Sequence, residues 1–589
     1  MFSHSFKTLC CFFIFASTTL FAQKEKRKVF STTPTYDEII STYTSLVANS
    51  KIAKLSVAGT TAVGKPLHVV VLSKDGKFDP PFSLMPNAVP SNTDTKAVVM
   101  INNGIHPGEP DGIDACIEMT RNIIQHPELL PDNVIVVIIP VFNVDGCLNR
   151  SSNSRANQNG PEEYGFRGNA QNLDLNRDFI KCDAVNTISL EKLFRQWRPD
   201  VFIDTHVSDG ADYQYVMTLI ASQHSKMNPV VAGFMNNQML PALYASMKAK
   251  NHDMCPYVET VGETPETGIV GFLDSPRFST GYASLFNCIS FVTETHMWKP
   301  YDERVWATYD FLFSVIDFCK GAELIKKAHR DADNAVAAQK IFVLNWQLDT
   351  AKSELIWFKG FEAKHKLSEI SGLQRMYYDR NAPYTKQVKY YNTYFPVTTV
   401  TAPEYYIIPM AYNKIIDRLA MNQVTIRRLK KDTVITVEAY NIDDYKSGNR
   451  PYESHYLHSA VKVSKSMQAI QYYKGDCIVQ VNQPSNRYIV ETLEPEGSDS
   501  FFAWNFFDGI LQQKEWFSDY IFEEKADSVL KNNDALKSEL VQKQKSDPAF
   551  AKDHWAQLYF IYSHSGYMEK TYNRYPVTRI NQPAKLPLE

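Results

Sequence analysis

Short apolar, β-branched runs alternate with longer amphipathic stretches between about residues 31 and 320. The apolar runs begin near His68 (HVVVLS), Ala97 (AVVMINN), Val134 (VIVVIIPVF), Asp200 (DVFIDTH) and Ile289 (ISFVTET). Continuous apolar runs are typical of strands buried on both faces, and segments such as GIDACIEMTRNIIQHP are typical of the helices that cover them. The pattern therefore predicts an α/β domain over residues 31–325, with helices on both faces of a central sheet.

The pattern of residue types along the chain changes after Lys320. A charged helical stretch leads into segments dense in Tyr, Thr and Val, such as KQVKYYNTYFPVTTVTAPEYYIIP and DTVITVEAY. These predict a β-rich second domain over residues 340–589, with a helical tail from about Ala526 to Lys552. The expected role of this second domain is to pack against the first domain and stabilise it. Its aromatic residues leave open a role in binding carbohydrate or another surface.

The first residues have the pattern of a secretory signal peptide over residues 1–22: Lys7, an apolar run from Leu9 to Phe21, then Ala22. A retained membrane anchor is the alternative. No later stretch reaches ~18 uninterrupted apolar residues, so we expect an exported protein, periplasmic or extracellular, without stable membrane insertion. The seven cysteines after this leader form no CxxC pair, which indicates buried thiols and leaves room for one disulfide.

The length, composition and net charge of the chain limit the classes of protein to which it can belong. A chain of 589 residues predicts two or three domains. Hydrophobic residues make up 44% and charged residues 22%, which excludes disorder as the main state. The formal net charge of -3 provides no long-range attraction for nucleic acid, which is therefore not an expected partner.

The segment MINNGIHPGEPDG places His106 and Glu109 on a strand-to-helix turn. An imidazole and a carboxylate at this spacing can reach one ion, although an exposed histidine beside a helix-starting glutamate has the same pattern. His206 ends an apolar strand about a hundred residues later, where a parallel sheet presents side chains to its ligand crevice. Three protein ligands with an open fourth position predict one catalytic zinc ion.

The segment GFRGNAQNLDLNRDF gathers Arg167, Asn176 and Arg177. Guanidinium groups bind carboxylates in a bidentate manner, so these residues form a candidate receptor for an anionic substrate group; a pair of surface arginines is the alternative. Asp174 is a candidate acceptor for the remaining ring proton of a zinc-bound histidine.

The segment CISFVTETHMWKP places Glu294 near the end of an apolar strand, where an unused carboxylate is costly. Facing a metal-bound water, it would serve as general base. His296 shares its face of the strand and is a candidate to brace Glu294 or to line the pocket. His455 and His458 would face opposite sides of a strand, which argues against a second metal site.

In their order and context, these motifs resemble the zinc carboxypeptidase family, over roughly residues 35 to 320. The motif spacing is closest to the N/E-type branch. The matching pieces are His106-Pro-Gly-Glu109, PVFNVDG from Pro140, Arg167 with Asn176-Arg177, the DTH of His206 and the TET of Glu294. The resemblance implies a mixed, largely parallel twisted sheet and a zinc metallocarboxypeptidase acting on the C-termini of peptides or proteins.

The resemblance also implies a role for each matched residue. The implied zinc ligands are His106, Glu109 and His206. Glu294 would activate the bound water, and Arg167 would polarise the scissile carbonyl and stabilise its oxyanion. Asn176 and Arg177 would bind the terminal carboxylate of the substrate.

Two features depart from the family pattern. A substrate-capping tyrosine usually lies about two dozen residues before the general base, where this sequence has Phe272 or Leu273. Tyr282 is the nearest candidate for substrate binding. The second domain is also much longer than the transthyretin-like domain of the N/E branch.

Two other functions remain open from the sequence. A zinc-dependent deacylase or cell-wall peptide hydrolase would use the same metal ligands and a carboxylate-binding arginine. An inactive ligand-binding protein would keep the fold without the chemistry.

Overall fold

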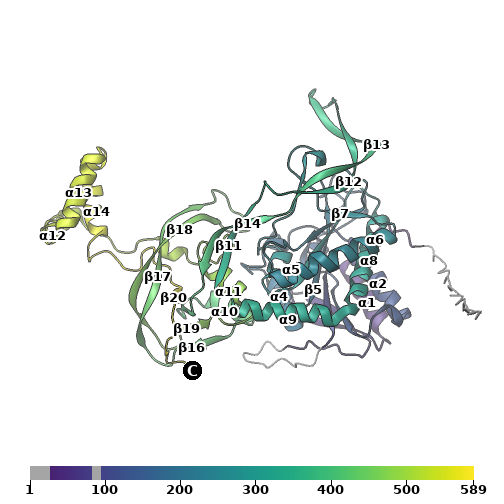
Figure 1. The fold of residues 1–589 in the computed structure, drawn as a ribbon, viewed down its shortest axis with the longest axis horizontal. Helices are drawn as coiled ribbons and strands as arrows, with labels where there is room; N and C mark the ends of the chain where they lie inside the picture. Colours follow the sequence, from purple (N-terminus) through teal and green to yellow (C-terminus); the bar gives the residue numbers. More distant parts are fainter. Residues whose placement is uncertain (1–26, 83–94) are drawn as a thin grey trace, which may run out of the picture.

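The structure is a computed structural model, and it describes residues 27–82 and 95–589. The predicted signal peptide lies outside the described residues. An eight-stranded sheet with the order β1-β2-β4-β3-β5-β10-β6-β7 forms the centre (Figure 1). Its strands are β1 (Ala53–Thr60), β2 (Pro66–Leu72), β3 (Ala97–Asn102), β4 (Val134–Ile139), β5 (Val201–Ser208), β6 (Met217–Ala221), β7 (Met254–Pro256) and β10 (Ile289–His296).

The strand directions confirm a mixed, largely parallel sheet. The pairs β3–β4, β3–β5, β5–β10 and β6–β7 are parallel. The pairs β1–β2, β2–β4 and β6–β10 are antiparallel. The parallel strands β3, β5 and β10 all end at the same edge of the sheet, so the side chains at their carboxyl ends are brought together.

Alternating side chains of each central strand pack into two separate hydrophobic cores, one on each face of the sheet. In β3, Val99 and Ile101 belong to one core, and Val98 and Met100 belong to the other. The helices of the first core are α1 (Tyr36–Val47), α2 (Asp111–Gln125), α3 (Val144–Leu148), α5 (Pro229–Phe234), α6 (Leu240–Ala249), α8 (Tyr301–Phe318) and α9 (Ala322–Ala338). The second core contains α4 (Val185–Trp197) and α7 (Ser279–Ser284), and it continues into residues beyond 340. The prediction of helices on both faces is confirmed.

Residues 340–589, called the C-terminal region below, are rich in strands, as predicted. Its β12 (Glu354–Leu367) and β13 (Gln374–Tyr391) form a long hairpin that projects from the molecule (Figure 1). This hairpin joins the short strands β8 (Glu259–Thr260) and β9 (Ile269–Val270), and β11 (Ile341–Leu348) pairs with β14 (Tyr394–Thr401). A six-stranded sheet follows in the order β16 (Ile426–Arg428), β19 (Cys477–Gln480), β15 (Tyr405–Ile408), β20 (Thr578–Ile580), β17 (Thr433–Ser447) and β18 (His458–Tyr472), with helices α10 (Asn413–Met421) and α11 (Asn486–Leu493).

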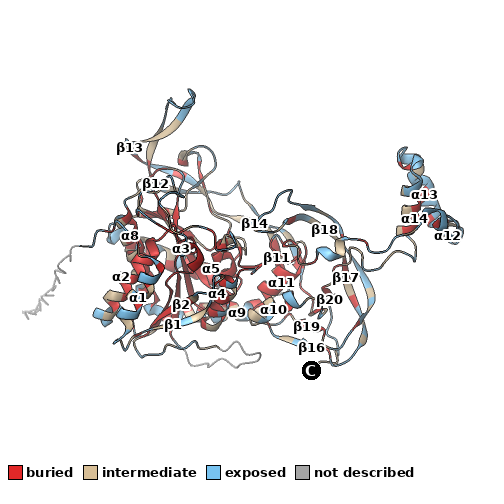
Figure 2. Cartoon of the chain, turned by 180° about the vertical axis from the view of Figure 1, so that it is seen from behind, coloured by how far each residue is buried: buried red, intermediate tan, exposed pale blue. Residues whose placement is uncertain are grey.

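The helical tail is longer than the sequence pattern indicates. It consists of α12 (Asp519–Lys531), α13 (Asp534–Ser546) and α14 (His554–Ser563). These helices lie apart from the central sheet and have a small core of their own (Figures 1 and 2). The aromatic sequence of α14, HWAQLYFIYS, hides its helical period, which is why the predicted tail ended before it.

The cysteines and the helices of residues 27–82 and 95–589 bear on two further predictions. The seven cysteines among them are buried and unpaired, which confirms the prediction of buried thiols. None of the described helices has both the length and the apolar character needed to cross a membrane.

Glu191 of α4 is a buried carboxyl group where the C-terminal region packs against the central sheet. Its Oε2 accepts a hydrogen bond from Asn422 Nδ2 at 3.0 Å, and its Oε1 has no hydrogen-bond partner. Burial, together with the charge of Asp178, raises the pKa of Glu191 to about 8 despite the Asn422 hydrogen bond. The folded protein therefore holds a proton on Glu191 that the unfolded chain releases near pH 4.5.

This proton predicts a pH-dependent stability. Because the folded pKa is raised, Glu191 costs stability increasingly as pH rises from about 4.5 to about 8. Glu191→Gln is expected to raise the melting temperature by a few degrees at pH 8.5 and to change it little at pH 5. Thermal unfolding at both pH values checks this; an equal shift at both would contradict it.

Candidate active site

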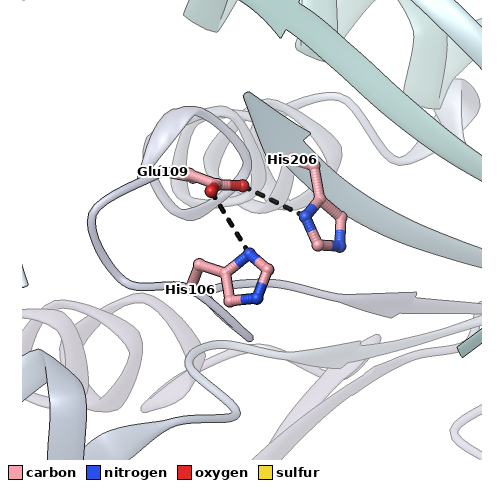
Figure 3. Close-up of side chains that lie close together, drawn as sticks. All are labelled: His106, Glu109 and His206. Atoms are coloured by element: carbon pink, nitrogen blue, oxygen red, sulfur yellow. Dashed lines mark hydrogen bonds and ion pairs between the residues drawn. The ribbon is translucent and has the colours of Figure 1, made fainter. Parts of the chain in front are cut away.

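Three side chains from two strand ends converge on one point. His106 and Glu109 lie on the turn between β3 and α2, where Gly104 takes a φ of 63° that favours glycine. His206 lies in β5, next to β3. His106 Nδ1 lies 3.2 Å from Glu109 Oε1, and His206 Nδ1 lies 3.0 Å from Glu109 Oε2 (Figure 3). All three side chains are buried, and one ligand atom from each lies within 4.8 Å of the others.

Two carboxylates orient the imidazole rings. His106 Nε2 lies 2.9 Å from Asp174 Oδ1, and His206 Nε2 lies 2.9 Å from Asp204 Oδ2. A proton on each Nε2 leaves both Nδ1 atoms as lone-pair donors toward the same centre. The structure therefore places Asp174 where the sequence predicted it, and Asp204 has the same position at the second histidine. Asp204 was not predicted from the sequence, although it lies two residues before His206 on the same face of the strand.

The donor set fits a zinc ion. Two imidazole nitrogens and a carboxylate are the ligands of many catalytic zinc sites. His106 Nδ1 is buried and makes no hydrogen bond, which is costly unless a cation occupies the centre. This is the only such cluster of His, Cys, Asp and Glu within residues 27–82 and 95–589.

Two guanidinium groups add positive charge beside the cluster. Arg155 Nη2 donates to Glu109 Oε1 at 2.7 Å, and Arg167 Nη1 lies 3.6 Å from the same oxygen. Burial disfavours the carboxylate, but His106 and Arg155 outweigh it and hold the pKa of Glu109 well below its usual range. Arg155 was not identified from the sequence, because its loop, SSNSRANQNG, contains no strand end or motif that marks it.

The predicted anion receptor lies in the same cavity, which has a volume of about 620 Å³. Arg167 Nε donates to Asp174 Oδ2 at 2.9 Å. Asn176 Oδ1 accepts a hydrogen bond from Ser279 N at 3.0 Å, and the Arg177 guanidinium lies 4.5 Å from the centre of the Phe278 ring. Arg167, Asn176 and Arg177 all line the cavity, so a ligand anion can meet two guanidinium groups and an amide there.

Glu294 faces this cavity from β10. In the parallel pairing of β10 with β5, Glu294 lies opposite His206. Burial, with the charges of Glu109 and Asp204, raises the pKa of Glu294 to about 8, against the opposing effect of His206. A divalent cation at the three ligands would favour the ionised form.

His296 neither braces Glu294 nor lines the cavity. Its Nε2 lies 3.0 Å from the Ala211 carbonyl oxygen, and its Nδ1 accepts a hydrogen bond from Trp298 N at 3.2 Å. Its ring packs edge-on against Tyr213. His455 lies 2.8 Å from Asp183, and His458 lies 3.0 Å from Asp508, so each has a carboxylate partner of its own.

The structure does not bring Tyr282 to the cavity. Its ring is fully buried between Phe179, Phe194 and Phe286, and its hydroxyl donates to Asn422 Oδ1 at 2.6 Å. Because α7 turns this side chain into the core, Tyr282 has no access to a ligand there. The expectation that it binds substrate has no support in this geometry.

Tyr257, rather than Tyr282, is the tyrosine whose side chain lines the cavity. It packs edge-on against Phe272, which also lines the cavity. Burial, together with the charge of Glu294, raises the pKa of the Tyr257 hydroxyl, which is therefore a proton donor at neutral pH. Tyr257 was not predicted from the sequence, because it lies just after β7, 37 residues before Glu294.

The chain is similar in sequence to known carboxypeptidases. Residues 40–229 match the zinc carboxypeptidase family. The chain is 22% identical over 442 residues to Carboxypeptidase 2 of Trichophyton rubrum, covering 70% of this chain and 75% of the relative. It is 21% identical over 445 residues to Carboxypeptidase 2 of Trichophyton equinum, covering 69% of this chain and 73% of the relative.

Solved structures include a metallo-carboxypeptidase from Burkholderia cenocepacia, with a TM-score of 0.34 and 16% identity over 48% of this chain and 68% of that chain. A carboxypeptidase A from Helicoverpa armigera has a TM-score of 0.37 and 14% identity over 52% of this chain and 77% of that chain. Over residues 40–229 this chain thus resembles the zinc carboxypeptidase family of peptide hydrolases, and over about 70% of its length it is similar to the Trichophyton carboxypeptidases.

Proposed function

We propose that this protein is an exported zinc carboxypeptidase that hydrolyses the last peptide bond of peptide or protein substrates. The observation that carries the proposal is the convergence on one cavity of the ligand cluster, Glu294 and the Arg167–Asn176–Arg177 receptor. A receptor for a terminal carboxylate beside a hydrolytic centre selects the end of a chain.

His106, Glu109 and His206 would hold a single zinc ion. When bound, zinc lowers the pKa of a water molecule to about 7 and polarises a carbonyl group. Asp174 and Asp204 keep the two rings oriented toward the ion and increase the basicity of the ligands.

The chain's own residues perform the remaining steps. Glu294 takes a proton from the attacking water and passes it to the leaving amine. Arg167, whose side chain is 45% exposed beside the cluster, donates to the oxygen on which negative charge develops. Asn176 and Arg177 bind the substrate carboxylate and orient the last peptide bond. Tyr257 donates a hydrogen bond to the bound peptide.

The proposal of export rests on the sequence pattern of residues 1–22, with a periplasmic or extracellular destination. A deacylase or a cell-wall peptide hydrolase is the second candidate, because it would use the same ligands. An inactive binding protein is a third, although each of the catalytic positions carries a residue able to perform its role.

Removing one ligand should remove the metal. His206→Ala is expected to lower zinc affinity by several orders of magnitude, and Asp204→Asn by about 10- to 100-fold. Chelator competition followed by metal analysis measures both values. His126→Ala changes an exposed histidine and is the matched control. Full zinc occupancy in His206→Ala would contradict the ligand assignment.

Removing the base should separate binding from turnover. Glu294→Gln is expected to keep zinc and to lower kcat by at least about 100-fold, because the amide cannot accept the proton. Peptides of matched sequence with a free or an amidated C-terminus test the receptor. Cleavage of the free acid alone supports a carboxypeptidase, whereas equal turnover of the amide would count against it.

The two tyrosines should behave differently. Tyr257→Phe is expected to lower kcat/KM by about tenfold, since it removes one hydrogen bond to the substrate. Tyr282→Phe is the matched control, expected to keep kcat/KM and to lose about 1 kcal/mol of stability with the Asn422 hydrogen bond. Steady-state kinetics and thermal unfolding check the pair; the reverse pattern would assign the substrate contact to Tyr282.

A further inference from the structure

Two separate segments form the receptor for the terminal carboxylate. The first is the loop that carries Asn176 and Arg177, and it begins at Asp174. The second is the start of α7, where Phe278 and Ser279 contact those two residues. The C-terminal region holds each segment by one carboxylate.

Glu453 holds the first segment. Its Oε2 accepts a hydrogen bond from the backbone nitrogen of Asp174 at 2.8 Å. Glu453 and the next residue, Ser454, have φ angles of 50° and 67°, in the left-handed region that non-glycine residues rarely occupy. His455 anchors the same turn through Asp183, at 2.8 Å. The turn is thus held in a strained conformation that directs Glu453 at the receptor loop.

Asp499 holds the second segment. Its Oδ2 accepts from Arg277 N at 3.0 Å, and its Oδ1 accepts from Arg277 Nε at 2.8 Å. Asp499 is buried, and Trp504 Nε1 donates to the same Oδ1 at 3.2 Å. The Trp504 ring stacks on Tyr452, the residue before Glu453, with 6.1 Å between ring centres. The two carboxylate contacts therefore belong to one connected group of side chains.

We propose that the C-terminal region completes the active site, with Glu453 and Asp499 acting as positioning residues that set the geometry of the carboxylate receptor. This inference rests on the proposed function. Glu453 acts through Asp174, which also contacts His106 and Arg167, so one contact of the C-terminal region bears on both the zinc ligand and the receptor. Contacts that only held the two parts of the chain together would affect stability and leave substrate affinity unchanged.

The experiment uses the full-length, zinc-loaded protein with Glu294→Gln as the parent, so that a bound peptide is not consumed. Calorimetry measures the affinity for a dipeptide with a free carboxylate and for its C-terminal amide. Adding Glu453→Ala is expected to weaken binding of the acid by about 10- to 100-fold, as for other residues that orient a site through a neighbour. Adding Glu453→Gln keeps an oxygen acceptor and should restore binding to within about threefold of the parent.

Asp499→Asn provides a second variant should Glu453→Ala not fold, and its expected loss is about 3- to 10-fold, since one acceptor oxygen remains. Asp253→Asn is the matched control: it breaks the ion pair with Lys359, which also joins the two parts of the chain but does not line the cavity. Metal analysis and thermal unfolding accompany each variant, to show that zinc and fold are retained.

The outcomes separate this inference from the proposed function. Weaker binding of the acid in Glu453→Ala or Asp499→Asn, with zinc retained and Asp253→Asn unchanged, supports the positioning role. Parent-like affinity in both variants overturns it while the proposed function stands. A loss matched by Asp253→Asn also overturns it, because any break between the two parts would then suffice. A parent that binds acid and amide equally overturns the proposed function and this inference with it.

Discussion

The parallel pairing of β5 with β10 is the constraint on which the site depends. It sets His206 directly opposite Glu294, so that the proposed ligand and the proposed base line the same cavity. Because adjacent strands lie about 4.8 Å apart, the two side chains are close neighbours on the wall of the cavity. A shift of one residue would turn either side chain to the opposite face of the sheet.

Buried charged groups surround the cluster of His106, Glu109 and His206. The need to pair these charges explains which residues lie around the cluster. Glu109, Asp174 and Asp204 are acceptors whose oxygens meet imidazole nitrogens or guanidinium groups. Such groups are costly to bury unless they are paired. Arg155, Arg167 and the two histidines supply that pairing, and a divalent cation would complete it. The network is therefore organised around positive charge at its centre, which suits an ion that polarises a carbonyl.

The sequence predicted the layers of the fold and the ligand cluster because both follow from local rules. Apolar strand runs define the sheet, and parallel strands end at one edge, so the sequence alone predicts that His106, Glu109 and His206 lie together. Asp174 was predicted from its place two residues before Asn176. The positions of the Tyr282 and Tyr257 side chains could not be predicted, because the direction of a side chain on a short helix such as α7, or after a short strand such as β7, depends on packing from distant segments. Asn422, which holds the Tyr282 hydroxyl, lies 140 residues away in the chain.

The second core continues from the central sheet into the C-terminal region. Phe202 of the central sheet and Tyr488 of α11 belong to the same buried cluster, and the ring of Phe286 stacks on that of Tyr488. Separating the C-terminal region would expose this apolar face to water at a cost of roughly 25 cal/mol for each Å². The shared core thus couples the stability of the central sheet to that of the C-terminal region.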